Sequence, residues 1–447
     1  MPKIVILGAG SGFGGRLSVD ILSCPSLQDS EICLVDLHEG RLAQVARVVE
    51  QTIARHNLSA RVRTSTDRRE LLPGADFVIT SISVGGPAYA GFPYSAEVRI
   101  PQKYGLEQTV ADTTSVGAIF RFLRTGPVQH QMVRDMEELC PGAMLLNHTN
   151  PMAMLSWLHC VDSSITYAGL CHGIQGTTEM LARWLEVPYN EVRFKVGGIN
   201  HLSWIVDIRH NGEDLYPRLR AMADDPEKRK HENVRLEIMK YFNYFCTESS
   251  HHDAEYLPYF LRTPALAERY GIAPRDVPDA PRHQRTWMSD GAGEQGATPG
   301  AELRRSGEYT SGIIEAVVTD QPYRFYANLM NTGGLISNLP ADACVEVLTM
   351  VDSTGLHPTY HGDLPPHLAA LCRSNISVHE LAVQAVLNRD REAAYHACLV
   401  DPNAAATLSL DQIKAMFDEL WSALEDGGLL DWFNERHQGP VRETCAS

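Results

Sequence analysis

The stretch Lys3-Ile-Val-Ile-Leu-Gly-Ala-Gly-Ser-Gly12 decides the fold of this chain. Its apolar run, Ile4–Leu7, is typical of a strand that is buried on both faces of a sheet. A glycine-rich turn follows at once, and apolar residues at helical spacing then continue to Leu22. This order predicts a dinucleotide-binding loop, because glycines let the backbone approach a pyrophosphate and a helix N-terminus supplies free N–H groups.

Four residues of this turn are the expected contacts of the dinucleotide. They are Gly8, Gly10, Ser11 and Gly12. Phe13 occupies the place of the usual third glycine, and Gly14 follows it, so a variant spacing is indicated. Asp36 ends the second apolar run, where an acid would accept the ribose 2′-hydroxyl and disfavour a 2′-phosphate. The pattern favours NAD over NADP; the alternative is a glycine-rich turn that binds no ligand.

Apolar runs and helical segments alternate through the first part of the chain. Further runs lie at Glu31–Asp36, Asp76–Ser83, Ala143–Asn147 and Ile165–Leu170, and helical patterns at Arg41–Arg55 and Phe120–Cys140. The alternation predicts an α/β fold with an N-terminal Rossmann-type doubly wound parallel sheet, as in lactate and malate dehydrogenases. Beyond about Phe194 long helical stretches dominate. We therefore expect an NAD-binding domain at 1–195 and a mainly helical α+β domain at 196–447, for substrate, metal and oligomer contacts.

Composition restricts the possible functions. The 447 residues contain no apolar stretch long enough to cross a membrane, and no secretion signal precedes the first strand. The ten cysteines show no Cys-x-x-Cys spacing, which favours reduced thiols in a cytoplasm over a disulfide framework. A formal net charge of −16 argues against nucleic acid and anionic membranes as partners.

Cys171 and His201 are the candidate metal ligands. Cys171 follows the run Ile165–Leu170, and His201 follows a short strand of the second region. Because strand carboxyl ends face the ligand crevice of an open α/β sheet, the two side chains could meet there. A thiolate and an imidazole suit Zn²⁺, Fe²⁺ or, less typically, Mn²⁺. Taken singly, a cysteine at a strand end more often belongs to the core, and a lone histidine is more often structural.

Asn150 and the segment His251–Tyr259 are further candidates for the site. Asn150 comes after the run Ala143–Asn147, so its amide would project into the crevice, cap a helix, or do both. The segment His251–Tyr259 gathers imidazoles, carboxylates and phenols. A phenol beside a metal can have its pKa lowered enough to act as a base, whereas a solvated helix start is the alternative reading.

Several motifs, in order, resemble glycoside hydrolase family 4, the NAD-dependent exceptions to hydrolysis by two carboxylates. They are Gly8-Ala-Gly-Ser11, Gly105-Leu-Glu-Gln-Thr-Val-Ala-Asp112, Arg121-x-x-Arg-Thr125, Asn150-Pro-Met152, Gly169-Leu-Cys-His172, Gly198-Ile-Asn-His201 and Ala254-Glu-Tyr256. The resemblance extends from the N-terminus to about Pro340. It implies a glycosidase that uses NAD and Mn²⁺ or another divalent metal, and it implies a homodimer or homotetramer.

The resemblance also implies a mechanism. NAD⁺ takes a hydride from the sugar C3, the C2 proton is removed, the glycosidic oxygen leaves, water adds and NADH returns the hydride. Cys171 and His201 match the metal ligands, Tyr256 matches the C2 base, and His172 lies near the position of the proposed acid. Asn150 would hold a substrate hydroxyl and is also expected among the NAD-binding residues. The same positions argue against two rivals, an NAD-dependent 2-hydroxy-acid dehydrogenase and a non-catalytic binding protein.

The substrate follows from finer comparison within the family. Several segments look most like melibiase-type α-galactosidases, whereas the tetrad Cys171–Ile174 is similar to α-glucuronidases. We expect an α-galactosidase, with α-glucuronidase or α-galacturonidase as the alternative. Tyr94 stands where phosphosugar enzymes carry an arginine, so a non-phosphorylated sugar is expected. Arg285 would meet a uronate carboxylate or belong to a basic surface patch. Ser115–Ala118 departs from the family pattern and changes a loop expected near the sugar.

Overall fold

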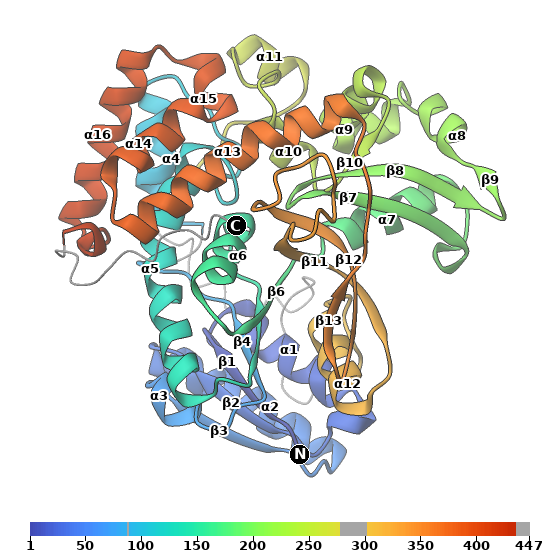
Figure 1. Cartoon of the computed structure of the whole chain (residues 1–447), viewed down its shortest axis with the longest axis vertical. Coiled ribbons are helices and arrows are strands. Elements are labelled where there is room, and N and C mark those ends of the chain that lie inside the picture. Colours follow the sequence, from blue (N-terminus) through green and yellow to red (C-terminus); the bar gives the residue numbers. More distant parts are fainter. Residues whose placement is uncertain (87–88, 278–301, 435–447) are drawn as a thin grey trace.

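The computed structural model describes residues 1–86, 89–277 and 302–434, and its frame is one mixed sheet of thirteen strands (Figure 1). The parallel part consists of β1 (Lys3–Leu7), β2 (Glu31–Val35), β3 (Arg61–Ser65), β4 (Phe77–Thr80), β5 (Met144–Asn147) and β6 (Thr166–Leu170). These strands lie in the order β3-β2-β1-β4-β5-β6, and every pair is parallel. This is the order of doubly wound dinucleotide-binding folds, so the predicted Rossmann-type sheet is confirmed.

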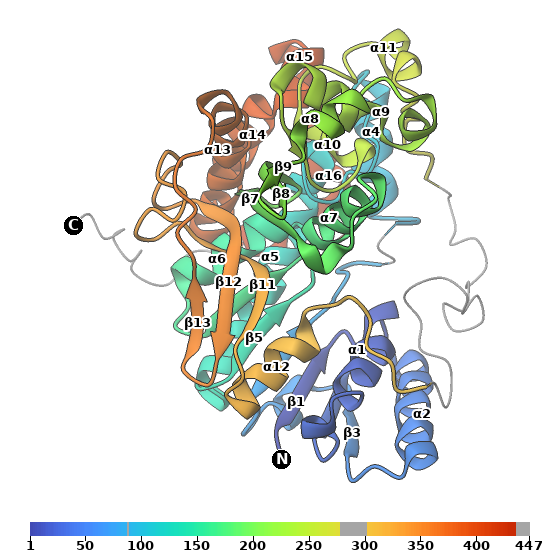
Figure 2. The ribbon, with the colours of Figure 1, turned by 90° about the vertical axis from the view of Figure 1, so that its right-hand side faces the viewer.

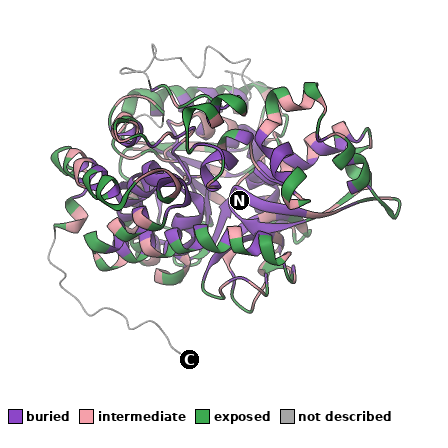
Figure 3. Cartoon of the chain, turned by 90° about the horizontal axis from the view of Figure 1, so that it is seen from above, coloured by how far each residue is buried: buried purple, intermediate pink, exposed green. Residues whose placement is uncertain are grey.

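Helices cover both faces of this parallel part. The first half of the chain contains α1 (Gly12–Leu22), α2 (Glu39–His56), α3 (Arg68–Leu71), α4 (Tyr94–Lys103), α5 (Ser115–Leu139), α6 (Met152–Asp162) and α7 (Gly173–Trp184). On β1, Ile4 and Ile6 pack in the core cluster that also holds Leu17 of α1, whereas Val5 packs with Val133 of α5. Both faces of β1 are therefore apolar, and β4 and β5 are likewise buried throughout, which explains the continuous apolar runs in the sequence. The edge strand β3 is mostly exposed. The strands form the buried interior in Figure 3.

Antiparallel strands extend the same sheet beyond β6. They are β7 (Val192–Ile199), β8 (Leu202–His210), β9 (Glu213–Asp214), β10 (Phe245–Cys246), β11 (Tyr323–Met330), β12 (Cys344–Asp352) and β13 (Gly355–Pro358). The order continues β6-β11-β12-β7-β8-β10, so β11 and β12 return from far along the chain to lie between β6 and β7. The short strand predicted before His201 corresponds to β7, but periodicity in the sequence did not reveal the long strands β8, β11 and β12. The sheet passes without a break through the predicted domain boundary near 195, which stays a prediction.

Most of the remaining helices lie in the upper part of the molecule in Figure 1, whereas α12 lies below them, beside α1. They are α8 (Tyr216–Ala221), α9 (Pro226–Phe242), α10 (Ser250–Tyr256), α11 (Pro264–Arg269), α12 (Thr310–Thr319), α13 (Pro366–Asn388), α14 (Arg391–Val400), α15 (Pro402–Thr407) and α16 (Leu410–Asp426). The largest core cluster joins Phe120 of α5 and Leu155 of α6 to Phe417 of α16. A mainly helical α+β second half is thus confirmed. Within the described residues, no helix has the length and apolarity needed to cross a membrane.

His379 on α13 predicts acid sensitivity of the fold. Its ring is buried, and neither ring nitrogen has a hydrogen-bond partner in the described structure. Burial lowers the pKa of His379 to about 4, below the value of about 6.5 in an unfolded chain. The folded state therefore binds fewer protons, and stability falls as the pH drops from 6.5 to 4, by at most about 3 kcal/mol. We expect His379→Leu to reduce this loss, seen as a melting temperature less dependent on pH in that window; an unchanged dependence would contradict this.

Candidate active site

Three side chains of types that can bind a metal come together from distant parts of the chain. Cys171 follows the carboxyl end of β6, His201 lies in the two-residue turn between β7 and β8, and Glu248 lies between β10 and α10. The Cys171 Sγ, a His201 ring nitrogen and a Glu248 carboxylate oxygen all lie within 4.8 Å of one another. Figures 1 and 2 both show α7, α10 and the β7–β8 hairpin side by side. One divalent cation could contact all three groups.

The His201 imidazole is held in a form that can bind a cation. Its backbone has a φ of 61°, which few residues other than glycine adopt and which often marks a functional site. Its Nδ1 lies 3.2 Å from the Thr113 Oγ1, leaving Nε2 toward Glu248 at 3.8 Å. Burial lowers the pKa of His201 to about 4, although Glu248 opposes this shift. The ring is therefore neutral near pH 7, with a lone pair available.

A charged network supports the Glu248 carboxylate. The His252 Nδ1 lies 3.9 Å from Glu248 Oε1, and the His252 Nε2 lies 3.2 Å from Asp112 Oδ1. Burial alone would lower the pKa of His252, but the Asp112 carboxylate outweighs it and raises the pKa to about 9. The Tyr89 hydroxyl donates to Asp112 Oδ2 at 2.9 Å. The sequence predicted no role for Asp112 or Tyr89 in supporting Glu248, although Asp112 belongs to the family motif Gly105–Asp112.

Tyr256, the predicted base, ends α10 beside this cluster. Its side chain is 1% exposed, its ring centroid lies 6.5 Å from that of His201, and its hydroxyl donates to the Thr113 carbonyl at 3.5 Å. Burial, reinforced by Asp112 and Cys171, raises the pKa of Tyr256 well above its usual value. Burial also raises the pKa of the Cys171 thiol. Both groups stay protonated at neutral pH unless a cation between them favours the charged forms.

His172, the predicted acid, lies on the rim of the site. It is exposed and immediately precedes α7, and its Nδ1 lies 3.2 Å from Glu308 Oε1. The other oxygen of Glu308 lies 3.8 Å from the His148 Nδ1, and the His148 ring lies 5.4 Å from that of Phe13. Glu308 thus links the rim to the glycine-rich loop. Nothing in the sequence pattern pointed to Glu308.

Three predictions remain, those for Asn150, Ser115–Ala118 and Arg285. Asn150 lies past the carboxyl end of β5 and is half-buried, but α6 begins at Met152 with Pro151 as its cap, so the helix-capping reading of Asn150 is wrong. Ser115–Ala118 was expected as a loop and instead forms the first turn of α5, since Thr114 is the residue that precedes the helix. Arg285 falls outside the described residues.

The glycine-rich loop has the close backbone approaches that a dinucleotide site needs. A Cβ on Gly8 would lie 2.2 Å from the Ser81 carbonyl oxygen, and one on Gly14 would lie 2.0 Å from that of Ala9. Gly14 therefore provides the tight helix packing usually given by a third glycine, which explains why Phe13 is tolerated. A Cβ on Gly12 would meet nothing within 4 Å.

Two polar residues complete this loop. The Ser11 side chain makes no capping bond to α1; its hydroxyl donates to the Ser81 Oγ at 3.2 Å. The Asp36 Oδ2 accepts the Gly10 N–H at 2.8 Å, which holds the acid of the second strand against the turn. The residues present fit a dinucleotide whose pyrophosphate lies over the start of α1.

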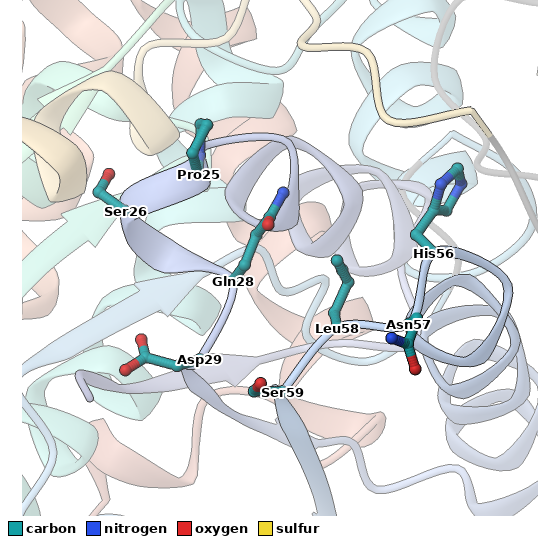
Figure 4. A pocket seen from close by; sticks show the side chains of 8 residues that line it. All are labelled: Pro25, Ser26, Gln28, Asp29, His56, Asn57, Leu58 and Ser59. Carbon is teal, nitrogen blue, oxygen red and sulfur yellow. The ribbon is translucent and has the colours of Figure 1, made fainter.

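A separate surface pocket lies away from these residues (Figure 4). It is lined by Pro25, Ser26, Gln28, Asp29, His56, Asn57, Leu58 and Ser59. It contains none of the predicted site residues, and we assign it no role.

The fold is that of doubly wound dinucleotide-binding proteins. The site adds a thiol, an imidazole and a carboxylate that lie close together past the carboxyl end of β6. Comparison with known families makes the assignment specific. The family 4 glycosyl hydrolase model matches residues 3–187, and the model of the family 4 C-terminal domain matches residues 196–404. The chain belongs to glycosyl hydrolase family 4, and it is a glycosidase.

Individual relatives agree with this assignment. An α-galactosidase of Bacillus subtilis (strain 168) is 38% identical over 434 residues, covering 95% of this chain and 99% of that protein. An α-galactosidase of Rhizobium meliloti (strain 1021) is 35% identical over 436 residues, covering 94% and 87%. A crystal structure of a 6-phospho-α-glucosidase from gut microorganisms, in complex with NAD and Mn²⁺, has a TM-score of 0.78 at 17% identity and covers 95% and 98%. That structure shows the shared fold.

Proposed function

We propose that this glycosidase cleaves α-galactosides of non-phosphorylated sugars and that it requires NAD⁺ and a divalent metal such as Mn²⁺. The observation that carries the proposal is the meeting of Cys171 and His201 beside Tyr256. The neighbouring His172 is joined through Glu308 to His148, whose ring contacts Phe13 of the glycine-rich loop. Two relatives above 30% identity, both α-galactosidases, support the choice of sugar.

Each side chain has a task in this proposal. When bound, NAD⁺ would supply a hydride acceptor for the sugar C3, and the metal would supply a Lewis acid at the sugar hydroxyls. Cys171 and His201 would hold the metal, and Asn150 would orient a hydroxyl of the sugar. Tyr256 would remove the C2 proton, and His172, oriented by Glu308, would protonate the departing glycosidic oxygen. Departure is then driven from C2, so no pair of carboxylates flanking the glycosidic bond is needed.

Tyr94 supports a sugar without a phosphate. Its side chain is fully buried, and its hydroxyl donates to the Val110 carbonyl at 2.6 Å. Burial raises the pKa of Tyr94 above its usual value, so the group is neutral and already engaged. It offers no positive charge to a phosphate.

A substrate panel tests the proposal. Purified protein is assayed with p-nitrophenyl α-galactoside, α-glucoside, α-glucuronide and α-galacturonide in the presence of NAD⁺, Mn²⁺ and a thiol reductant. We expect the galactoside to react fastest, with no net NADH formed. A faster glucuronide or galacturonide would move the assignment to a uronidase, and steady NADH accumulation would favour a 2-hydroxy-acid dehydrogenase.

Two glycines of the loop should separate cofactor binding from folding. Gly12→Ala adds a methyl where the protein leaves space, so we expect an unchanged melting temperature and an NAD⁺ Kd raised at least about tenfold by crowding of the pyrophosphate. Gly14→Ala drives a methyl into the Ala9 backbone and should cost about 1–3 kcal/mol of stability. Calorimetric titration and thermal unfolding measure the two effects. Unchanged NAD⁺ affinity in Gly12→Ala would contradict this loop as the cofactor site.

The proposal also covers the cellular compartment and the oligomeric state. We propose a cytoplasmic enzyme, since each described cysteine is a free thiol. We also propose a homodimer or homotetramer, which light scattering on the purified chain can test.

A further inference from the structure

We propose that Glu248 is a third protein ligand of the metal, and that Gly173 is glycine because any side chain there would displace the Glu248 carboxylate. This inference rests on the proposed function, because it concerns the metal that Cys171 and His201 would hold. It assigns a role to two residues outside the thiol and imidazole pair.

The backbone aims Glu248 at the pair. Glu248 has a φ of 83°, a strained value for a residue with a side chain, which persists only where the surrounding structure enforces it. Its N–H donates to the Thr177 Oγ1 at 3.3 Å, which ties this turn to α7. The carboxylate is 18% exposed and has Oε2 3.8 Å from His201 Nε2. One oxygen of this half-buried carboxylate therefore faces His201, while Oε1 lies 3.9 Å from the His252 Nδ1, so Oε2 is the oxygen placed for a cation.

Gly173 controls whether the carboxylate can lie there. A Cβ on Gly173 would lie 2.2 Å from Glu248 Oε2 and 3.4 Å from the Cys171 Sγ. The backbone of Gly173 is helical, so its position in α7 does not itself require glycine. Glycine is needed at this position because the Glu248 carboxylate occupies the space that a side chain would take.

The resulting donor set suits the proposed ion. Thiolate and imidazole alone are a soft pair, and a carboxylate oxygen adds the hard donor that Mn²⁺ prefers. A thiolate and a carboxylate together also balance the two charges of the ion. Three protein ligands still leave positions for substrate oxygens and water.

The test measures Mn²⁺ binding directly on the NAD⁺-loaded chain, by electron paramagnetic resonance of free Mn²⁺ and by calorimetry. Glu248→Gln keeps the shape but weakens the donor, and Gly173→Ser adds the obstructing side chain. We expect both to raise the Mn²⁺ Kd at least tenfold. Gly176→Ser is the matched control, because Gly176 lies in the same helix with nothing within 4 Å of its Cβ position, and its Kd should not change.

A crystal structure of the wild-type chain with Mn²⁺ gives a readout that does not depend on how variants fold. We expect a Glu248 oxygen at about 2.2 Å from the ion, as for other hard oxygen ligands of divalent metals. A Glu248 oxygen beyond about 3 Å, or wild-type affinity in both variants while Cys171→Ser loses binding, overturns this inference alone. No Mn²⁺ binding by the wild-type chain would overturn the proposed function as well.

Discussion

Cys171→Ser is expected to lower kcat at least about a thousandfold while leaving NAD⁺ affinity unchanged. The serine hydroxyl is a poor ligand for a soft or borderline cation, and its oxygen cannot supply the charge of a thiolate. Loss of a Lewis acid removes several kcal/mol of transition-state stabilisation, and about 4 kcal/mol corresponds to this factor. NAD⁺ should still bind, because its expected contacts lie in the loop at the start of α1.

Cys160→Ser is the matched control, since Cys160 and Cys171 are the two described cysteines that are neither fully buried nor fully exposed. Cys160 lies in α6, in contact with the cluster around Val133 rather than with His201. Activity is measured by p-nitrophenol release and NAD⁺ binding by calorimetry. Equal activity of Cys171→Ser and wild type would remove Cys171 from the metal site.

Tyr256→Phe is expected to lower kcat by about 10²–10⁴-fold, the usual contribution of a positioned proton-transfer group. The substitution removes one hydroxyl and leaves the buried ring, so Mn²⁺ and NAD⁺ affinities should stay within about twofold. If Tyr256 removes the C2 proton, a substrate deuterated at C2 should show a larger isotope effect in this variant, because that step becomes more limiting.

Tyr167→Phe controls for the loss of any buried phenol. The Tyr167 hydroxyl pairs with Ser156 at 3.0 Å inside the parallel half of the sheet, so its removal should reduce stability without reducing kcat. A Tyr256→Phe enzyme as active as the Tyr167→Phe control would exclude Tyr256 as the base.

Much of the first half of the fold could be predicted because its signals are local. The run Ile4–Leu7, the glycine-rich turn and the regular alternation of runs with helices each reflect strands buried on both faces. The strands β11 and β12 could not be predicted in the same way. Their place between β6 and β7 depends on pairing over long sequence separations, such as Asn328 with Gly169, which no local period encodes.

The site residues also differ in whether local sequence could predict them. Cys171, His201 and Tyr256 stood out because of residue type and motif, and the structure brings them together. Glu308 and the pairing of Asp112 with His252 depend on distances between segments that are far apart in the sequence. The clash between a Gly173 Cβ and Glu248 is also visible only in three dimensions.

The most direct test of the central claim is hydrolysis of p-nitrophenyl α-galactoside in D₂O with NAD⁺ and Mn²⁺, followed by NMR of the released galactose. Oxidation at C3 followed by proton removal at C2 predicts deuterium at C2 of the product, no net NADH, and no turnover when NAD⁺ is removed. Galactose released without deuterium at C2, at a rate independent of NAD⁺, would contradict the account.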